Sequence, residues 1–75
     1  MRPQYRIRVA LNRRRLSLHL SYADIARMLG ISPTAARQIF TNLYQDITIT
    51  ALARVASALD WTISDAVLAA DKEVH

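Results

Sequence analysis

The side chains with the most evident chemistry in this 75-residue chain are arginines, which supply nine of its ten basic residues. Six of them fall within the first 15 residues, where no acidic residue opposes them, so this segment carries a charge of +6. Residues 16–59 add +1 and residues 60–75 contribute −3, which gives the net charge of +4. Because the planar guanidinium group suits phosphate, the basic segment is either a nucleic-acid contact or a solvated helix face.

Side chains that could catalyse a reaction or hold a metal are too sparse to form a site. The chain has no cysteine, and its two histidines, His19 and His75, are far apart in sequence with no metal-ligand spacing. We assign Asp60, Asp65 and Asp71 to helix caps and a solvated tail rather than to acid–base chemistry. We therefore expect no catalytic residue, no metal and no cofactor, and the chain is too short for a separate domain that binds an effector.

The elements that must position the arginines are short helices. A single glycine and two prolines leave too little turn chemistry for hairpins, whereas 52% hydrophobic residues supply a core. Residues 47–50 alternate like a strand but have no pairing partner. No apolar run reaches the roughly 20 residues that span a bilayer. We expect one all-α domain over residues 1–75, cytoplasmic and without membrane contact.

Capping residues and apolar periodicity predict a helix-turn-helix inside a bundle of five helices. Ser21 and Asp24 have the spacing of an N-terminal capping pattern, and Gly30 can end that helix in a left-handed conformation. Ser32 followed by Pro33 is an N-cap with proline at the first helical position. The predicted elements are a basic first helix at 4–16, the helix-turn-helix at 21–41, and helices at 48–59 and 62–70.

This pattern resembles the Cro and phage-repressor family, also called the xenobiotic-response-element family. Ala26 and Gly30 stand where that family has the alanine that lets two helices approach and the glycine of the turn. The segments SYADIARMLGIS and LARVASALDWTISD are similar to its second, fourth and fifth helices. The resemblance spans roughly residues 7–68 and implies a lambda-repressor-like DNA-binding domain, a transcriptional regulator whose third helix enters the major groove of double-stranded DNA.

The resemblance places the base-reading positions on the predicted third helix, at Pro33, Thr34, Ala35, Arg37 and Gln38. Gln38 can pair with an adenine edge, Arg37 can reach guanine or phosphate, and Ala35 or the Thr34 methyl group can touch a thymine methyl. Pro33 has no backbone N–H and offers only shape. The simpler interpretation is that these residues only face solvent.

Phosphate contacts are expected beside that helix. Tyr22 stands where the family has a phosphate-contacting glutamine. The family often pairs an arginine late in the first helix with a glutamate late in the third, but the matching residues are Arg15 and Phe40, so Arg15 either stacks on Phe40 or turns outward. His19 stands where glycine is frequent. The expected phosphate contacts are Arg13, Arg15, Tyr22, Ser32, Asn42, Tyr44 and Gln45.

A homodimer is expected, because one small reading head rarely supplies enough affinity alone. The apolar candidates for its seam are Trp61, Ile63, Val67 and Leu68, with Trp61 assigned to core or dimer packing. The resemblance implies a prokaryotic, nucleoid-associated repressor that regulates its own phage, plasmid, mobile-element or restriction-modification operon at a palindromic operator. The alternative is a protein-interaction module, similar to an antiactivator or antitoxin, that keeps the fold and binds a protein partner.

Overall fold

The computed structural model of the chain describes residues 3–43 and 45–72. No β-strand occurs in these residues, so the predicted all-α fold is confirmed. The residues that alternate like a strand instead lead into the first turn of a helix. The described part of the chain forms helices α1 (Pro3–Ser17), α2 (Tyr22–Leu29), α3 (Pro33–Thr41), α4 (Ile49–Ala58) and α5 (Ile63–Lys72).

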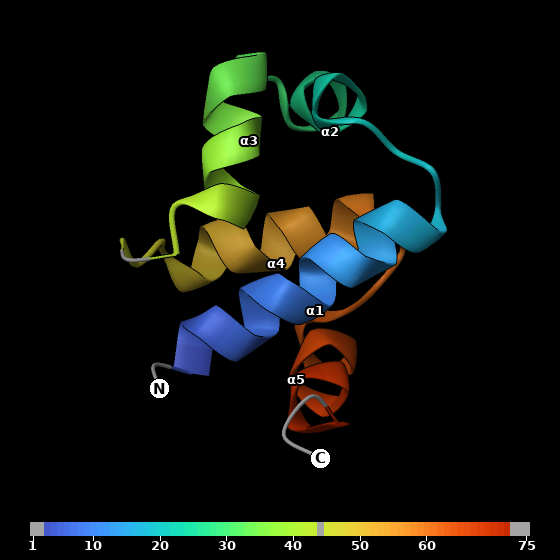
Figure 1. Ribbon diagram of the computed structural model, residues 1–75, viewed down its shortest axis with the longest axis vertical. Coiled ribbons are helices and arrows are strands. Elements are labelled where there is room, and N and C mark those ends of the chain that lie inside the picture. Colours follow the sequence, from blue (N-terminus) through green and yellow to red (C-terminus); the bar gives the residue numbers. More distant parts are fainter. Residues whose placement is uncertain (1–2, 44, 73–75) are drawn as a thin grey trace.

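The helices α1 and α4 lie across the middle of the molecule, with α2 and α3 at one end and α5 at the other (Figure 1). Helix α2 packs against α3 and α4, and α1 packs against α3 and α5. The helix-turn-helix is therefore built on a platform of α1 and α4. This arrangement separates α3, which is expected to read DNA, from α5, which is expected to pair two subunits.

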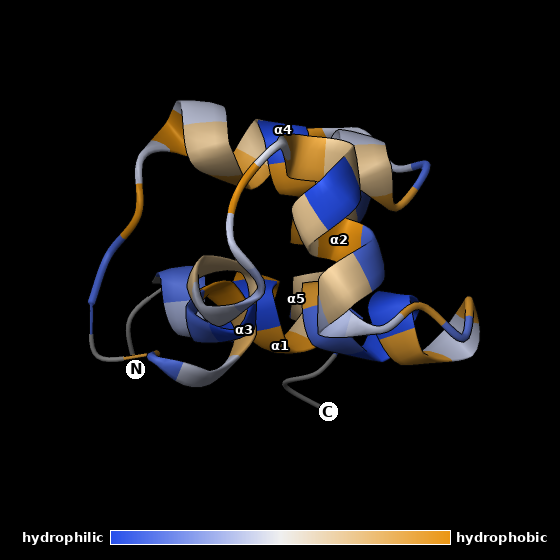
Figure 2. Cartoon of the chain, turned by 90° about the horizontal axis from the view of Figure 1, so that it is seen from above, coloured by the Kyte–Doolittle hydropathy of each residue, from blue (hydrophilic) through white to orange (hydrophobic). Residues whose placement is uncertain are grey.

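The core that holds the helices together is aliphatic, with small residues where helices approach closely. Leu11, Ile25, Leu52 and Leu59 are each fully buried at 0% exposure, and they come from α1, α2, α4 and the end of α4. Figure 2 shows hydrophobic residues interleaved with hydrophilic ones along the helices, as amphipathic helices around one core require. The small buried residues of this core are Ala26, Ala36, Ala56 and Ala66.

Side-chain caps fix where α2, α3, α4 and α5 begin, and the caps of α2 and α5 are reciprocal. The Ser21 hydroxyl accepts a hydrogen bond from the Asp24 N–H at 3.1 Å, while the Asp24 carboxylate accepts one from the Ser21 N–H at 2.8 Å. Thr62 and Asp65 repeat this pair at the start of α5, at 3.1 and 2.9 Å. These bonds satisfy N–H groups that have no partner inside a helix. The N-caps of α3 and α4 are Ser32 and Thr48.

Three helices end next to a residue with a left-handed backbone, although the chain has one glycine. Gly30 ends α2 with φ of 67°, whereas exposed His19 after α1 and Asp60 after α4 have φ of 58° and 60°. At each end the next N–H donates to the carbonyl five residues earlier, which is the Schellman arrangement. His19 and Asp60 thus hold a conformation that glycine adopts at lower cost.

Candidate nucleic-acid interface

The helix-turn-helix positions α3 as a projecting element with two different sides. Ser32 caps it, accepting a hydrogen bond from the Ala35 N–H at 3.1 Å, and Pro33 occupies its first turn, where a missing N–H costs nothing. Ala36 and Phe40 point into the core and are 0% and 4% exposed. Helix α3 is therefore anchored by its inner side, and its outer side is left for a partner.

The outer side of α3 carries a polar stripe of Thr34, Arg37, Gln38 and Thr41. All four are exposed, and their spacing of three and four residues places them on one helix face. Thr41 was not among the expected base-reading residues, although its position three residues after Gln38 could have indicated it. Its hydroxyl donates to the Arg37 carbonyl at 2.9 Å. The structure thus gathers three expected residues and one additional residue on this stripe.

The other two expected base-reading residues lie at the beginning of α3. Pro33 is placed in the first turn, and its exposed ring ends the polar stripe. Ala35 is half-buried and lies beside the polar stripe rather than on it. Any contact of Ala35 with DNA would therefore be at the edge of the stripe.

Arg15 is turned into the molecule, which corrects its assignment to phosphate. Its residue is 8% exposed, and its Nη1 donates to the Leu20 carbonyl at 2.7 Å. Its Cζ lies 4.3 Å from the centre of the Tyr22 ring and 5.5 Å from that of Phe40. Because position 40 offers no carboxylate, the guanidinium stacks on two aromatic rings instead. Of the two alternatives for Arg15, the structure shows the one in which it packs on Phe40.

Of the remaining expected phosphate contacts, Arg13 lies on α1, Tyr22 begins α2, and the others precede or follow α3 in the chain. Arg13 and Ser32 are exposed, while Tyr22 is half-buried at the N-terminus of α2 with its ring 5.8 Å from that of Phe40. In the loop after α3, the Asn42 amide donates to the Gln45 side-chain oxygen at 3.1 Å. Tyr44 lies outside the described residues. Apart from Tyr44 and the inward-facing Arg15, the expected phosphate contacts are thus at or near the surface.

Arg8, one of the six arginines of the basic segment, is a buried structural residue that sequence reasoning did not single out. It is 1% exposed. Its Nε donates to the Ile39 carbonyl at 2.7 Å, and its Nη2 donates to the carbonyls of Gln38 and Asn42 at 3.1 and 2.8 Å. Its Nη1 donates to the Gln45 carbonyl. Burial lowers the pKa of Arg8, and the nearby charge of Asp46 partly opposes this effect.

Two further arginines donate to carbonyls at helix ends. Arg14 Nε donates to the Leu59 carbonyl after α4 at 3.0 Å, and its Cζ lies 5.2 Å from the centre of the Trp61 ring. Arg54 Nη2 donates to the Leu29 carbonyl at the end of α2, also at 3.0 Å. A cation at a helix C-terminus stabilises the negative end of the helix dipole. Arginines that could have bound phosphate therefore donate hydrogen bonds to the carbonyls at helix C-termini instead.

The expected dimer residues divide between core and surface. Trp61 and Ile63 are half-buried and pack against the core. Val67 and Leu68 on α5 are 42% and 62% exposed. The exposed apolar part of the expected seam is therefore the pair Val67 and Leu68.

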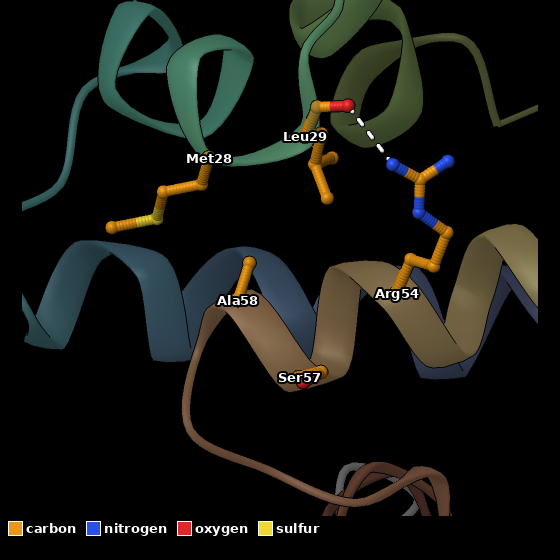
Figure 3. A pocket seen from close by; sticks show the side chains of 5 residues that line it. All are labelled: Met28, Leu29, Arg54, Ser57 and Ala58. Atoms are coloured by element: carbon orange, nitrogen blue, oxygen red, sulfur yellow. Dashed lines mark hydrogen bonds between the residues drawn. The ribbon is translucent and has the colours of Figure 1, made fainter.

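A hollow beside the helix-turn-helix is small and open. It has a volume of about 250 Å³ between α2 and α4, and the bond from Arg54 to Leu29 closes one side of it (Figure 3). Ligand pockets are typically 300–1,000 Å³ and enclosed. The residues that line this hollow are Met28, Leu29, Arg54, Ser57 and Ala58.

No group of three or more His, Cys, Asp or Glu side chains in residues 3–43 and 45–72 could hold a metal ion. No helix in the same residues is both long and apolar enough to cross a membrane.

Two short helices joined at a glycine turn, with the second presenting a polar outer face, define a helix-turn-helix DNA-binding domain. The sequence model of a protein family described as Helix-turn-helix matches residues 11–65. The chain therefore belongs to this family of DNA-binding regulators, as its resemblance to Cro and phage repressors predicts. No curated protein and no solved structure matches the chain.

Proposed function

We propose that this protein is a sequence-specific transcriptional regulator that binds a palindromic operator as a homodimer. The observation that carries this proposal is the polar stripe of α3, in which Thr34, Arg37 and Gln38 are exposed together while Ala36 and Phe40 anchor the opposite side. An α-helix with such an outer face fits the major groove of B-DNA. The side chains of the polar stripe then recognise the base sequence of the DNA.

The chemistry of each residue suggests its role in that groove. Gln38 donates to and accepts from an adenine edge, and Arg37 binds guanine or a phosphate. The methyl group of Thr34 touches a thymine methyl. Pro33 and the exposed edge of Ala35 make only van der Waals contacts with the walls of the groove. Around the helix, phosphate is bound by Arg13, Tyr22, Ser32, Asn42 and Gln45, together with Tyr44.

Exposed Val67 and Leu68 support pairing of two copies through α5. Helix α5 lies at the opposite end of the molecule from α2 and α3, so a seam there leaves both reading helices accessible (Figure 1). Two-fold pairing places two copies of α3 on successive major grooves, which requires half-sites about one helical turn apart. The operator we propose is that of the protein's own operon in a phage, plasmid, mobile element or restriction-modification system, as is frequent in the resembled family.

Selection of bound sites from a random duplex library, followed by footprinting, tests this function. A regulator of this kind should enrich a palindrome, and its affinity should fall steeply with salt, with a log–log slope of about −0.9 per neutralised phosphate. Binding that shows no salt dependence, or no enriched site, would contradict the proposal. That result would favour the protein-interaction alternative, in which the fold serves a protein partner.

A further inference from the structure

One face of α1 holds the backbone that follows the reading helix. Arg8 and Gln4 lie one helical turn apart on this face. Arg8 donates to the last carbonyls of α3 and to two carbonyls of the loop, while Gln4 binds the far end of the loop at Ile47. Both ends of the segment 42–47 are therefore tied to the same helix.

The bond between Gln4 and Ile47 is reciprocal. The amide nitrogen of Gln4 donates to the Ile47 carbonyl at 2.7 Å, and the amide oxygen of Gln4 accepts from the Ile47 N–H at 2.9 Å. The side-chain amide thus pairs with the loop as a neighbouring strand would. Such a pair fixes the position and the orientation of the Ile47 peptide groups, immediately before the cap of α4.

The guanidinium of Arg8 donates hydrogen bonds to buried carbonyls, which an apolar residue of similar size could not do. It fills a buried position at the negative end of α3 and satisfies carbonyls from both the helix and the loop. Its planar fork has donors in fixed directions, so the helix end and the loop are set relative to each other. The side chains of Asn42 and Gln45 project from this fixed backbone and are bonded to each other.

We propose that Arg8 and Gln4 are positioning residues for DNA binding, which hold the loop so that Asn42 and Gln45 reach phosphate while α3 occupies the major groove. This inference rests on the proposed function. Neither residue touches DNA itself. Their effect is to remove the freedom of the loop before binding, so that less conformational entropy is lost when the phosphate contacts form.

The experiment compares Arg8→Met and Gln4→Ala with the matched control Arg14→Met. Arg8→Met and Arg14→Met each remove one positive charge from α1. The first removes the bonds to carbonyls of α3 and the loop, and the second removes the bond to the Leu59 carbonyl at the end of α4. Gln4→Ala changes no charge. The readouts are the affinity for the selected operator and the ethylation interference that reports which phosphates are contacted, both measured where thermal unfolding shows each variant folded and sedimentation shows the wild-type oligomeric state.

We expect Arg8→Met and Gln4→Ala to weaken operator binding by about tenfold and to lose ethylation interference at the phosphates that the loop contacts, because Asn42 and Gln45 no longer reach them. Arg14→Met should keep the wild-type interference pattern. A purely structural role would lower the unfolding temperature without changing this pattern. Should Arg8→Met fail to fold, the uncharged change Gln4→Ala decides alone.

The outcomes separate this inference from the function on which it rests. If the wild type binds duplex DNA steeply with salt, and folded Arg8→Met and Gln4→Ala keep its affinity and its interference pattern, the positioning role is overturned while the proposed function stands. Loss of the same interference by Arg14→Met would also overturn it, because the effect would then follow charge alone. Absence of salt-dependent binding by the wild type overturns the proposed function itself.

Discussion

At the scale of single residues, identical arginines have different tasks. Arg8 and Arg15 are 1% and 8% exposed and donate to backbone carbonyls, whereas Arg37 is exposed on the outer side of α3. The five donors of a guanidinium serve carbonyl oxygens as well as phosphate oxygens. What an arginine does here is therefore decided by which acceptors lie within its reach.

Gln38→Ala and Arg13→Ala should affect DNA binding in different ways. In the proposed complex Gln38 reads a base edge, so its loss should cost roughly 1–3 kcal/mol of discrimination at one or two base pairs. In the same proposal Arg13 binds the DNA backbone, so its loss should weaken binding to all sequences alike and reduce the salt slope by about 1. Competition binding with operator and scrambled duplexes measures both effects. Identical behaviour of the two variants on both duplexes would show that the reading head is assigned wrongly.

His19→Gly should stabilise the protein. His19 has φ of 58° at the end of α1 and is exposed, so glycine removes backbone strain without loss of packing. We expect a gain of roughly 0.5–1 kcal/mol in the free energy of unfolding, measured by urea denaturation. His19→Ala is the control, since it removes the imidazole but keeps the Cβ atom and the strain. Equal stabilities of the glycine and alanine variants would refute this explanation.

At the scale of elements, short helices depend on their ends. Helix α2 has 8 residues and α3 has 9, too few for stable helices in isolation. Each begins with a side-chain cap, and α2 ends on a left-handed glycine, while Arg54 and Arg8 donate to the last carbonyls of α2 and α3. Local caps and long-range arginine donors together keep the helix-turn-helix rigid enough to present the polar stripe.

The cap of α2 should weaken in acid. The pKa of Asp24 is lowered, first by the hydrogen bond from the Ser21 N–H, then by that from the Ser21 hydroxyl, and further by the charge of Arg27. Because the folded state holds the carboxylate ionised, this contribution is complete above the ordinary aspartate pKa of about 3.9 and is lost as the pH falls through the lower folded value. Asp24→Asn should thus lose less thermal stability between pH 6 and pH 2 than the wild type, by about the contribution of this one group. Parallel melting curves against pH for the two proteins would contradict this.

At the scale of the whole molecule, the polar stripe of α3 and the acidic, partly apolar surface of α5 lie at opposite ends. Helices α2 and α3 lie at one end and α5 at the other, and the acidic residues Asp65 and Asp71 are exposed on α5 (Figure 1). An acidic α5 is repelled by phosphate, which favours an orientation in which α3 meets DNA and α5 is turned away from it. In the proposed dimer, the exposed pair Val67 and Leu68 then faces a second copy rather than DNA.

Leu68→Glu should prevent pairing of two subunits. Leu68 is 62% exposed, so the change leaves the core intact, and in a two-fold seam it adds two like charges close to each other. Sedimentation should show a monomer where the wild type is dimeric, and operator affinity should fall by at least about tenfold as binding becomes limited to one half-site. Met28→Glu is the control, because Met28 is 52% exposed on α2 and adds the same charge elsewhere. A dimer that survives Leu68→Glu would exclude this seam.

Much of the fold follows from local sequence signals. The capping pairs at Ser21 and Thr62, the cap Ser32 with Pro33, and the turn at Gly30 each act within a few residues, so the chain itself determines where helices begin and end. The same local spacing predicts the outward stripe of Thr34, Arg37 and Gln38. Thr41 extends that stripe by the same spacing, so it was predictable as well.

The destinations of the long side chains were decided by the tertiary structure. Arg8 reaches carbonyls 30 to 37 residues away, and Arg14 reaches one 45 residues away, so only the packing of α1 on distant segments determines that these charges serve helix ends. The inward placement of Arg15 depends likewise on the rings of Tyr22 and Phe40. The sequence by itself determined the helices, their caps and the sequence of charges, because these are local properties. Which arginines are buried and which apolar residues of α5 stay exposed depends on the neighbours that the fold brings to them.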